Sequence, residues 1–174
     1  MDNVSLTCVP ASEANSLEND ELRVDGYDTL TQPLAGQCKA SSGYVRGYIR
    51  PRHNAADFNK FAEQPVSNYL LDIFGDASNR IGVFASAANT IFLGSAVGGA
   101  WTMAAWDCTG AIVADTKYLL EVEYTASWVQ LRIDGLVVVT LVKAMNFVTV
   151  PTTAYWGSSC YFGANQGDMT FDEP

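Results

Sequence analysis

The sequence lacks an apolar run long enough to cross a membrane, and it is poor in positive charge. A membrane-spanning helix needs about 20 consecutive apolar residues, so we expect no membrane insertion. The 174 residues include 10 Lys plus Arg against 19 Asp plus Glu, which gives a formal net charge of −9. This acidic balance repels phosphate and removes the counterion release that drives nucleic-acid binding, so we expect no nucleic-acid partner.

Two further absences concern processing and redox chemistry. The N-terminal stretch has neither the basic start nor the apolar core of a secretory signal peptide, so we expect synthesis in the cytoplasm without one. The four cysteines, Cys8, Cys38, Cys108 and Cys160, lie too far apart for a C-x-x-C pair or another compact metal site. We expect the four cysteines to be unpaired and to act as separate small hydrophobic residues. Disulfides, with three connectivities, are the alternative in an oxidising compartment.

Catalytic motifs are absent as well. The only histidine, His53, lies in "RPRHNAAD", and nothing around it resembles a nucleophile elbow, which argues against a Ser-His-Asp triad. Glu121 and Glu123 stand two residues apart on one predicted strand, at a separation that suits a glycosidase. A solvated outward strand face explains the same two residues. We therefore expect no enzymatic activity.

Short strand-like segments fill the chain from Glu21 onward. Apolar runs recur between clusters of Gly, Asn, Asp, Ser and Pro, at the spacing of an all-β protein. The segments "KYLLEVEYT" and "SGYVRGYIRP" alternate with period two, as half-buried strands do. One short helix is predicted after Asn54. We predict a two-sheet antiparallel β-sandwich domain over residues 22–174, preceded by a polar N-terminal arm over residues 1–21.

The segment "SWVQLRIDGLVVV", residues 127–139, predicts a hairpin that turns at Asp134 and Gly135. Asp-Gly is typical of a type I′ turn, which fixes the register of the two strands. A regular register places one face in the core: Val129, Leu131, Ile133, Leu136, Val138 and Thr140. The opposite face is then half apolar, so another part of the chain or a partner subunit covers it. The candidate contact residues are Trp128, Val137, Val139 and Leu141.

Aromatic and turn residues supply the candidate ligand sites. Sugars present apolar C–H faces to aromatic rings, and the candidates for carbohydrate binding are Trp106, Asp107, Tyr155 and Trp156. Packing at the corners of the sandwich is the alternative for these residues. The candidate calcium ligands are Asp76, Asn79 and Asp168, in loops where such residues also serve as ordinary turn formers. No other cofactor is expected.

Three stretches resemble laminin G-like domains of the concanavalin A-like lectin and glucanase superfamily. "KYLLEVEYTASWVQLRIDGLVV" resembles the family hairpin, in which a strand ending near V-x-Y leads through a short turn into L-x-x-D-G. "YWGSSCYFGANQGDMTFDE" is similar to later family strands, and "SGYVRGYIRP" to an early one. The resemblance implies a concanavalin A-like jelly roll. The E-x-D-x-x-E motif of the sugar-cleaving relatives is absent, which argues against glucanase activity.

We therefore expect a non-enzymatic recognition or structural module on a particle such as a bacteriophage virion, as a decoration, tail or fibre component. The missing export signal, the Asn- and Ser-rich leader, the acidic charge and the apolar hairpin face favour it. Expected partners are further copies of the chain, other virion proteins or a cell-surface glycan, and the expected location is the virion surface or the medium after host lysis. The alternatives are a stand-alone carbohydrate-binding module and, less favoured, a glycoside hydrolase.

Overall fold

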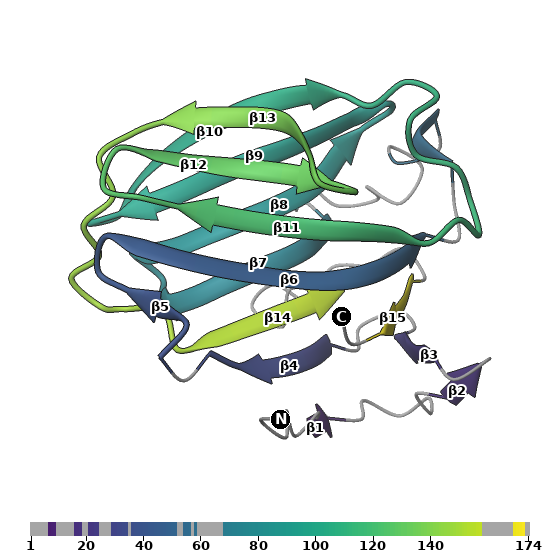
Figure 1. Cartoon of the computed structure of the whole chain (residues 1–174), viewed down its shortest axis with the longest axis horizontal. Helices are drawn as coiled ribbons and strands as arrows, with labels where there is room; N and C mark the ends of the chain where they lie inside the picture. Colours follow the sequence, from purple (N-terminus) through teal and green to yellow (C-terminus); the bar gives the residue numbers. More distant parts are fainter. Residues whose placement is uncertain are drawn as a thin grey trace.

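Two antiparallel β-sheets face each other in the computed structural model of the chain (Figure 1). The structure describes residues 7–9, 16–18, 21–24, 29–34, 36–51, 54–56, 58, 68–157 and 169–172. It confirms the predicted two-sheet antiparallel β-sandwich. Among these residues, no helix combines the length and the apolar character needed to cross a membrane.

The first sheet has seven strands in the order β1 (Thr7–Val9), β4 (Thr29–Pro33), β14 (Thr153–Gly157), β7 (Asn68–Asp76), β8 (Asn79–Ala87), β9 (Thr90–Val97) and β10 (Ala100–Asp107). The second sheet has eight, in the order β13 (Leu136–Val142), β12 (Trp128–Ile133), β11 (Tyr118–Tyr124), β6 (Ser42–Pro51), β15 (Met169–Asp172), β3 (Glu21–Val24) and β2 (Ser16–Glu18), with β5 (Cys38–Lys39) paired to β6. Strands β1 and β2 lie within the segment predicted as a polar arm. The domain boundary near residue 22 stays a prediction.

The core fills the space between the sheets. Strands β7 to β10 form an antiparallel meander, and their buried inward side chains include Leu71, Ile73, Ile81, Val83, Ile91 and Leu93. The alternation predicted for β11 is confirmed, since its inward side chains Tyr118, Leu120, Val122 and Tyr124 are all buried. Cys38 and Cys108 are free and buried, as expected of separate small hydrophobic residues.

The helix predicted after Asn54 is not found among the described residues. Residues 55, 56 and 58 form a short 3₁₀ turn, and residues 59–67 lie outside the described part of the chain. The Asn54 side chain accepts a hydrogen bond from the backbone N–H of Ala114 at 2.9 Å. It therefore ties this turn to the loop that precedes β11.

Two glycines of β6 make room for aromatic rings in the core. A Cβ atom on Gly47 would lie 2.8 Å from Cη2 of Trp156, and one on Gly43 would overlap the ring of Tyr124. Distances below 3 Å are too short for real Cβ contacts, so glycine is required for these rings to pack. The two strands from opposite sheets, β6 and β14, are thereby locked together through Trp156.

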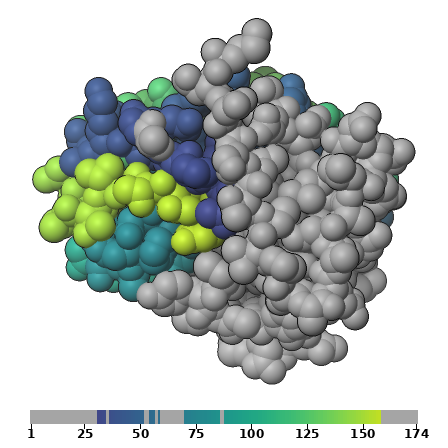
Figure 2. Space-filling model, turned by 90° about the horizontal axis from the view of Figure 1, so that it is seen from below, coloured from purple at the N-terminus to yellow at the C-terminus, as the bar shows by residue number. Residues whose placement is uncertain are grey.

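The segment before β14 closes one end of the sandwich. The backbone N–H of Phe147 donates to the carbonyl of Ala40 at 2.8 Å, and that of Thr152 donates to the carbonyl of Phe74 at 3.1 Å. The segment thus binds the second sheet through the loop before β6 and the first sheet through β7. Figure 2 shows these yellow-green residues beside the blue residues of the β4–β6 region and the teal residues of the first sheet.

The register of the β12–β13 hairpin differs from the regular one predicted from the sequence. The turn itself is confirmed, because Asp134 and Gly135 have φ angles of 50° and 78°, as a type I′ turn requires. Arg132 faces Val137 as expected, but Leu131 then faces Val139, so Val138 is the extra residue of a β-bulge.

Because of the bulge, the residues of β13 after Val138 face the side opposite to the one predicted. Val139 and Leu141, predicted as partner contacts, are core residues at 9% and 5% exposure, whereas Leu136, predicted in the core, is 72% exposed. Thr140, also predicted in the core, faces solvent, and Val138 is half-buried. The physical reason is that a regular register would bury the Thr140 hydroxyl among apolar side chains and leave two apolar side chains outside. Of the four candidate contacts, Val137 is 50% exposed and Trp128 is half-buried.

A buried ion pair lies on the outward side of the first sheet. The Arg80 guanidinium donates through Nε to Oδ1 of Asp72 at 3.0 Å and through Nη2 to Oδ2, and each residue is 3% exposed. Arg80 Cζ lies 5.4 Å from the ring centre of Phe74 and 5.7 Å from that of Trp101. The pKa of Asp72 is raised to about 6, because burial disfavours the charged carboxylate more than Arg80 favours it.

The raised pKa of Asp72 predicts that the stability of the protein depends on pH. Its pKa of about 6 in the folded state exceeds the ordinary value of 3.8, so the folded state binds the proton more tightly between these values. The contribution of Asp72 to the free energy of unfolding is therefore greatest below about pH 4 and falls by at most about 3 kcal/mol as the pH rises through about 6. Urea unfolding should show the wild type losing stability relative to Asp72→Asn over this window. Parallel pH curves for the two proteins would contradict the assignment.

Candidate functional site

The outward side of the second sheet combines aromatic, amide and charged side chains on three neighbouring strands. We call the outward side chains of β6, β11 and β12 the polar face: Tyr44, Arg46, Tyr48, Arg50, Leu119, Glu121, Glu123, Trp128, Gln130 and Arg132. Strand alternation places them opposite the buried core residues of the same strands. The polar face is therefore a set of aromatic, amide and charged groups held in place by the packed core beneath it.

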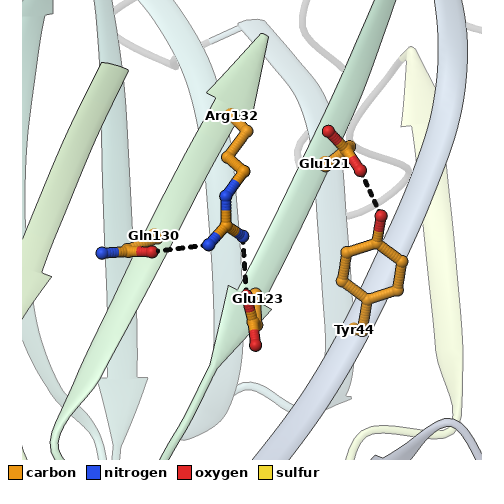
Figure 3. A network of polar contacts seen from close by, with 5 residues as sticks. All are labelled: Tyr44, Glu121, Glu123, Gln130 and Arg132. Carbon is orange, nitrogen blue, oxygen red and sulfur yellow. Dashed lines mark hydrogen bonds and ion pairs between the residues drawn. The ribbon is translucent and has the colours of Figure 1, made fainter. Parts of the chain in front are cut away.

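Cross-strand pairing joins part of the polar face into a network (Figure 3). Glu123 on β11 pairs with Tyr44 on β6 and with Gln130 on β12. Arg132 donates through Nη1 to Glu123 Oε2 at 2.6 Å and through Nη2 to Gln130 Oε1 at 2.9 Å. The guanidinium thus fixes both neighbouring side chains, while the amide nitrogen of Gln130 points away from it in Figure 3.

A second contact in Figure 3 buries one of the two carboxylates. The Tyr44 hydroxyl donates a hydrogen bond to Glu121 Oε1. Tyr44 is 38% exposed, whereas Glu121 is only 8% exposed. The pKa of Tyr44 is raised, first by burial and then by the neighbouring Glu121, so the hydroxyl remains a donor at neutral pH. The sequence pattern suggested a solvated Glu121, and the structure corrects this because the Tyr44 side chain lies against it.

Charges of both signs lie on and beside the polar face. The face itself carries the basic Arg46, Arg50 and Arg132 and the carboxylates of Glu121 and Glu123, and the exposed Asp115, Lys117 and Asp134 lie beside it. Lys117 Nζ lies 4.6 Å from the ring centre of Tyr48, a cation–π distance. Arg46 is exposed and pairs across the sheet with Glu121. The face can therefore offer donors to a hydroxyl-rich or anionic ligand.

The four residues predicted to bind carbohydrate do not form one site. Trp156 is a core residue at 3% exposure, and its Nε1 donates to Gln32 Oε1 at 3.0 Å. Tyr155 is on the opposite side of β14, where its ring meets that of Phe74 edge-on at 5.8 Å between centroids. Trp106 packs against the core from β10, which is separated from β14 by three strands. Both tryptophans therefore pack in or against the core, which was the alternative to carbohydrate binding.

The predicted calcium ligands take part in turns. Asp76 Oδ1 accepts a hydrogen bond from Asn79 Nδ2 at 3.0 Å, and Asp107, of the predicted carbohydrate site, accepts from the N–H of Thr109 at 3.0 Å. Asp168 lies outside the described residues. Within the described part of the chain, no three His, Cys, Asp or Glu side chains are grouped so that they could hold a metal ion. Calcium binding stays a prediction.

Sequence reasoning noted the residues of the polar face but missed their grouping. The alternation of "SGYVRGYIRP" correctly placed Tyr44 and Arg46 on one strand face, and the hairpin pattern placed Gln130 and Arg132 on another. The missing information was that β6 pairs with β11, where Tyr44 and Glu121 are 77 residues apart along the chain. Three short outward patterns with alternating aromatic and charged residues are the signal that could have suggested a shared face.

No protein-family model and no curated protein matches the sequence of this chain. Solved structures do match its fold. The receptor-binding domain of botulinum neurotoxin C/D mosaic serotype has a TM-score of 0.68 at 8% identity, covering 98% of this chain and 42% of that chain. The botulinum neurotoxin serotype D binding domain has a TM-score of 0.65 at 9% identity, with coverage of 98% and 42%.

A third similar structure contains a sugar. It is the botulinum neurotoxin serotype D ligand-binding domain in complex with N-acetylneuraminic acid, with a TM-score of 0.62 at 8% identity, covering 98% of this chain and 42% of that chain. The present chain thus spans about two fifths of the length of these structures. The likeness, at such low identity, shows the fold alone.

Proposed function

We propose that this chain is a non-enzymatic recognition module that binds carbohydrate through the polar face. The observation that carries the proposal is the grouping of aromatic rings, an amide and exposed positive charge on three paired strands. Tyr44 offers a ring at 38% exposure, Arg46 offers hydrogen-bond donors on the same strand, and Gln130 offers them on β12. A sugar uses both features at once, because its C–H faces pack on rings while its hydroxyls bind planar polar groups.

The exposed guanidinium of the polar face favours an acidic glycan. A guanidinium binds a carboxylate through charge-assisted hydrogen bonds, which are about twice as strong as neutral ones. Arg46 is the exposed guanidinium in this position. The botulinum neurotoxin serotype D ligand-binding domain, solved in complex with N-acetylneuraminic acid, supports the proposal because 42% of that chain has a fold similar to this one. The similarity concerns the fold only. The residues proposed to bind the sugar are inferred from this chain alone.

The state of the two carboxylates supports binding over hydrolysis. A retaining or inverting glycosidase uses one carboxyl as a general acid and the other as a nucleophile or base. Here the Tyr44 hydroxyl donates a hydrogen bond to Glu121, and the Arg132 guanidinium donates one to Glu123. Both carboxylates thus have internal partners in place of a substrate.

The proposal is tested by glycan binding and by one pair of matched variants. Arg46→Ala and Lys39→Ala each remove an exposed positive side chain, from the polar face and from β5 respectively. Arg46→Ala is expected to weaken binding of a sialylated glycan by about tenfold or more, the loss of one charge-assisted contact, whereas Lys39→Ala should leave it unchanged. Isothermal titration calorimetry after a glycan array measures this. The proposal is rejected if no acidic or neutral glycan binds, or if both variants behave alike.

The particle on which the module acts is a separate part of the proposal. We retain the virion decoration, tail or fibre setting, with other virion proteins as neighbours, on the strength of the acidic composition alone. Proteomics of purified particles from the source of the sequence provides the test. The setting is supported if this chain copurifies with particles and abandoned if it occurs only as a soluble cell protein.

A further inference from the structure

Strand β13 is an edge strand without the usual protection. It ends the order of the second sheet and pairs only with β12 among the strands that the structure describes. Its sequence, LVVVTLV, has no charged residue and no proline. Leu136, Val137 and Val142 are 72%, 50% and 81% exposed. One strand edge therefore presents unpaired backbone groups next to exposed apolar side chains.

Such an edge specifies the kind of partner that it binds. The outward N–H and C=O groups of an edge strand form hydrogen bonds with a further β-strand, and natural proteins block this with lysine, proline or inward charges. Strand β13 has only the bulge at Val138, near its start. Strand β10, at the corresponding edge of the first sheet, ends in the charged Asp107. Of these two edge strands, β13 is the one without a charged residue.

We propose that two copies of this chain associate by antiparallel pairing of β13 with β13 about a two-fold axis. A chain of net charge −9 repels its copies, and an uncharged strand is where two copies approach at least electrostatic cost. The ends of β13 are flanked by opposite charges, Asp134 before it and Lys143 after it. Antiparallel pairing sets the acidic end of each strand beside the basic end of the other, whereas parallel pairing would set like beside like. The partner is therefore a second copy.

The end of the strand is held in place for this pairing. Lys143 Nζ donates to the carbonyls of Ser95 and Ala100 at 2.9 and 2.7 Å, which anchors the end of β13 to the first sheet. The ammonium group has three donors, so a third remains for a carboxylate. Val139 and Leu141 point into the core, so pairing leaves the core intact and covers the exposed Val137 and Val142.

The pairing would bring two of the proposed carbohydrate sites together. This part of the inference rests on the proposed function. Joining the two second sheets edge to edge makes one continuous sheet, so both polar faces lie on the same side of it. From β11 of one copy to β11 of the other is five strand spacings, or about 24 Å. Two sites at that separation bind a glycan-covered surface together. Avidity can then exceed the affinity of one site by about a hundredfold or more.

Matched double variants test the pairing by measurement of mass. Val137→Lys with Val142→Lys puts two charges on the edge of β13. Val113→Lys with Val148→Lys puts the same charges at sites of similar exposure, 48% and 86%, away from it. Sedimentation velocity without glycan is expected to show dimers for the wild type and the control pair, and monomers for the β13 pair. The proposal is overturned if the wild type is monomeric at high micromolar concentration. It is also overturned if both double variants are monomeric or both are dimeric.

Cysteine variants then test the direction of pairing. The pairing of Asp134 with Lys143 places the two-fold axis between Val138 and Val139, so Val137 of one copy lies opposite Thr140 of the other. The double variant Val137→Cys with Thr140→Cys should therefore cross-link the two copies, whereas each single variant should not. An in-register parallel pairing would cross-link each single variant and would overturn the proposal. The monomeric lysine variant should retain glycan binding in solution but lose surface avidity. Loss of glycan binding in a wild-type dimer would remove the proposed function and leave the pairing standing.

Discussion

Leu141→Ala is expected to lower the free energy of unfolding by about 2–5 kcal/mol, the usual loss for a buried leucine. Leu141 is 5% exposed and pairs across the hairpin with the buried Val129. Truncation removes core contacts and leaves a cavity between the sheets. Urea or thermal unfolding of the purified variant measures the loss, with the midpoint and the slope recorded for both proteins.

The matched control lies on the same strand. Leu136 is the same residue type but is 72% exposed, so Leu136→Ala should change the free energy of unfolding by no more than about 0.5 kcal/mol. A hairpin without the bulge at Val138 exposes Leu141 and leaves the pairing of Leu136 with Ile133 unchanged. Equally small losses in the two variants would therefore show that the regular register is the correct one.

Trp156→Ala is expected to cost about 3–5 kcal/mol of stability, the range for a buried tryptophan. The ring crosses from the first sheet to the second, where it packs against Gly47, and its indole N–H donates to Gln32 Oε1 at 3.0 Å. Its removal leaves an unfilled volume and an unpaired amide oxygen at once. Differential scanning calorimetry should show a large decrease in the melting temperature.

Trp101→Ala serves as the control for this prediction. Trp101 is 40% exposed and lies on the outward side of β10, so its loss is expected to cost on the order of 1 kcal/mol. Equal losses for the two tryptophans would contradict the core role of Trp156. Reduced glycan binding with unchanged stability in Trp156→Ala would restore that residue to a ligand site.

The sequence predicted the parts of the fold that local pattern controls. The period-two alternation of "KYLLEVEYT" placed Tyr118 and Tyr124 in the core, and Asp134-Gly135 predicted the type I′ turn. The bulge at Val138 could not be read locally, because β13 is apolar at six of its seven positions and either side could face the core. The polar Thr140 decides the matter, since placing it outside requires one extra residue in the strand.

The candidate site was less predictable than the fold. Its side chains come from β6, β11 and β12, and a sequence pattern does not say which strands pair across about 70 residues. Glu121 shows the effect, because the strand pattern suggested a solvated carboxylate and the side chain is 8% exposed beside Tyr44. Isolated tryptophans near turns attracted attention instead, but tryptophan at 3% exposure, as at position 156, is a packing residue.

The most direct test of the carbohydrate proposal is a titration of the isotope-labelled protein with a sialylated oligosaccharide, followed by backbone amide chemical shifts. The account predicts saturable shifts concentrated at residues 44–48, 119–123 and 128–132, on the three strands of the polar face. Shifts centred on residues 101–107 or 153–157 would place the site on the first sheet. That result, or the absence of any shift at saturating sugar, would contradict the account.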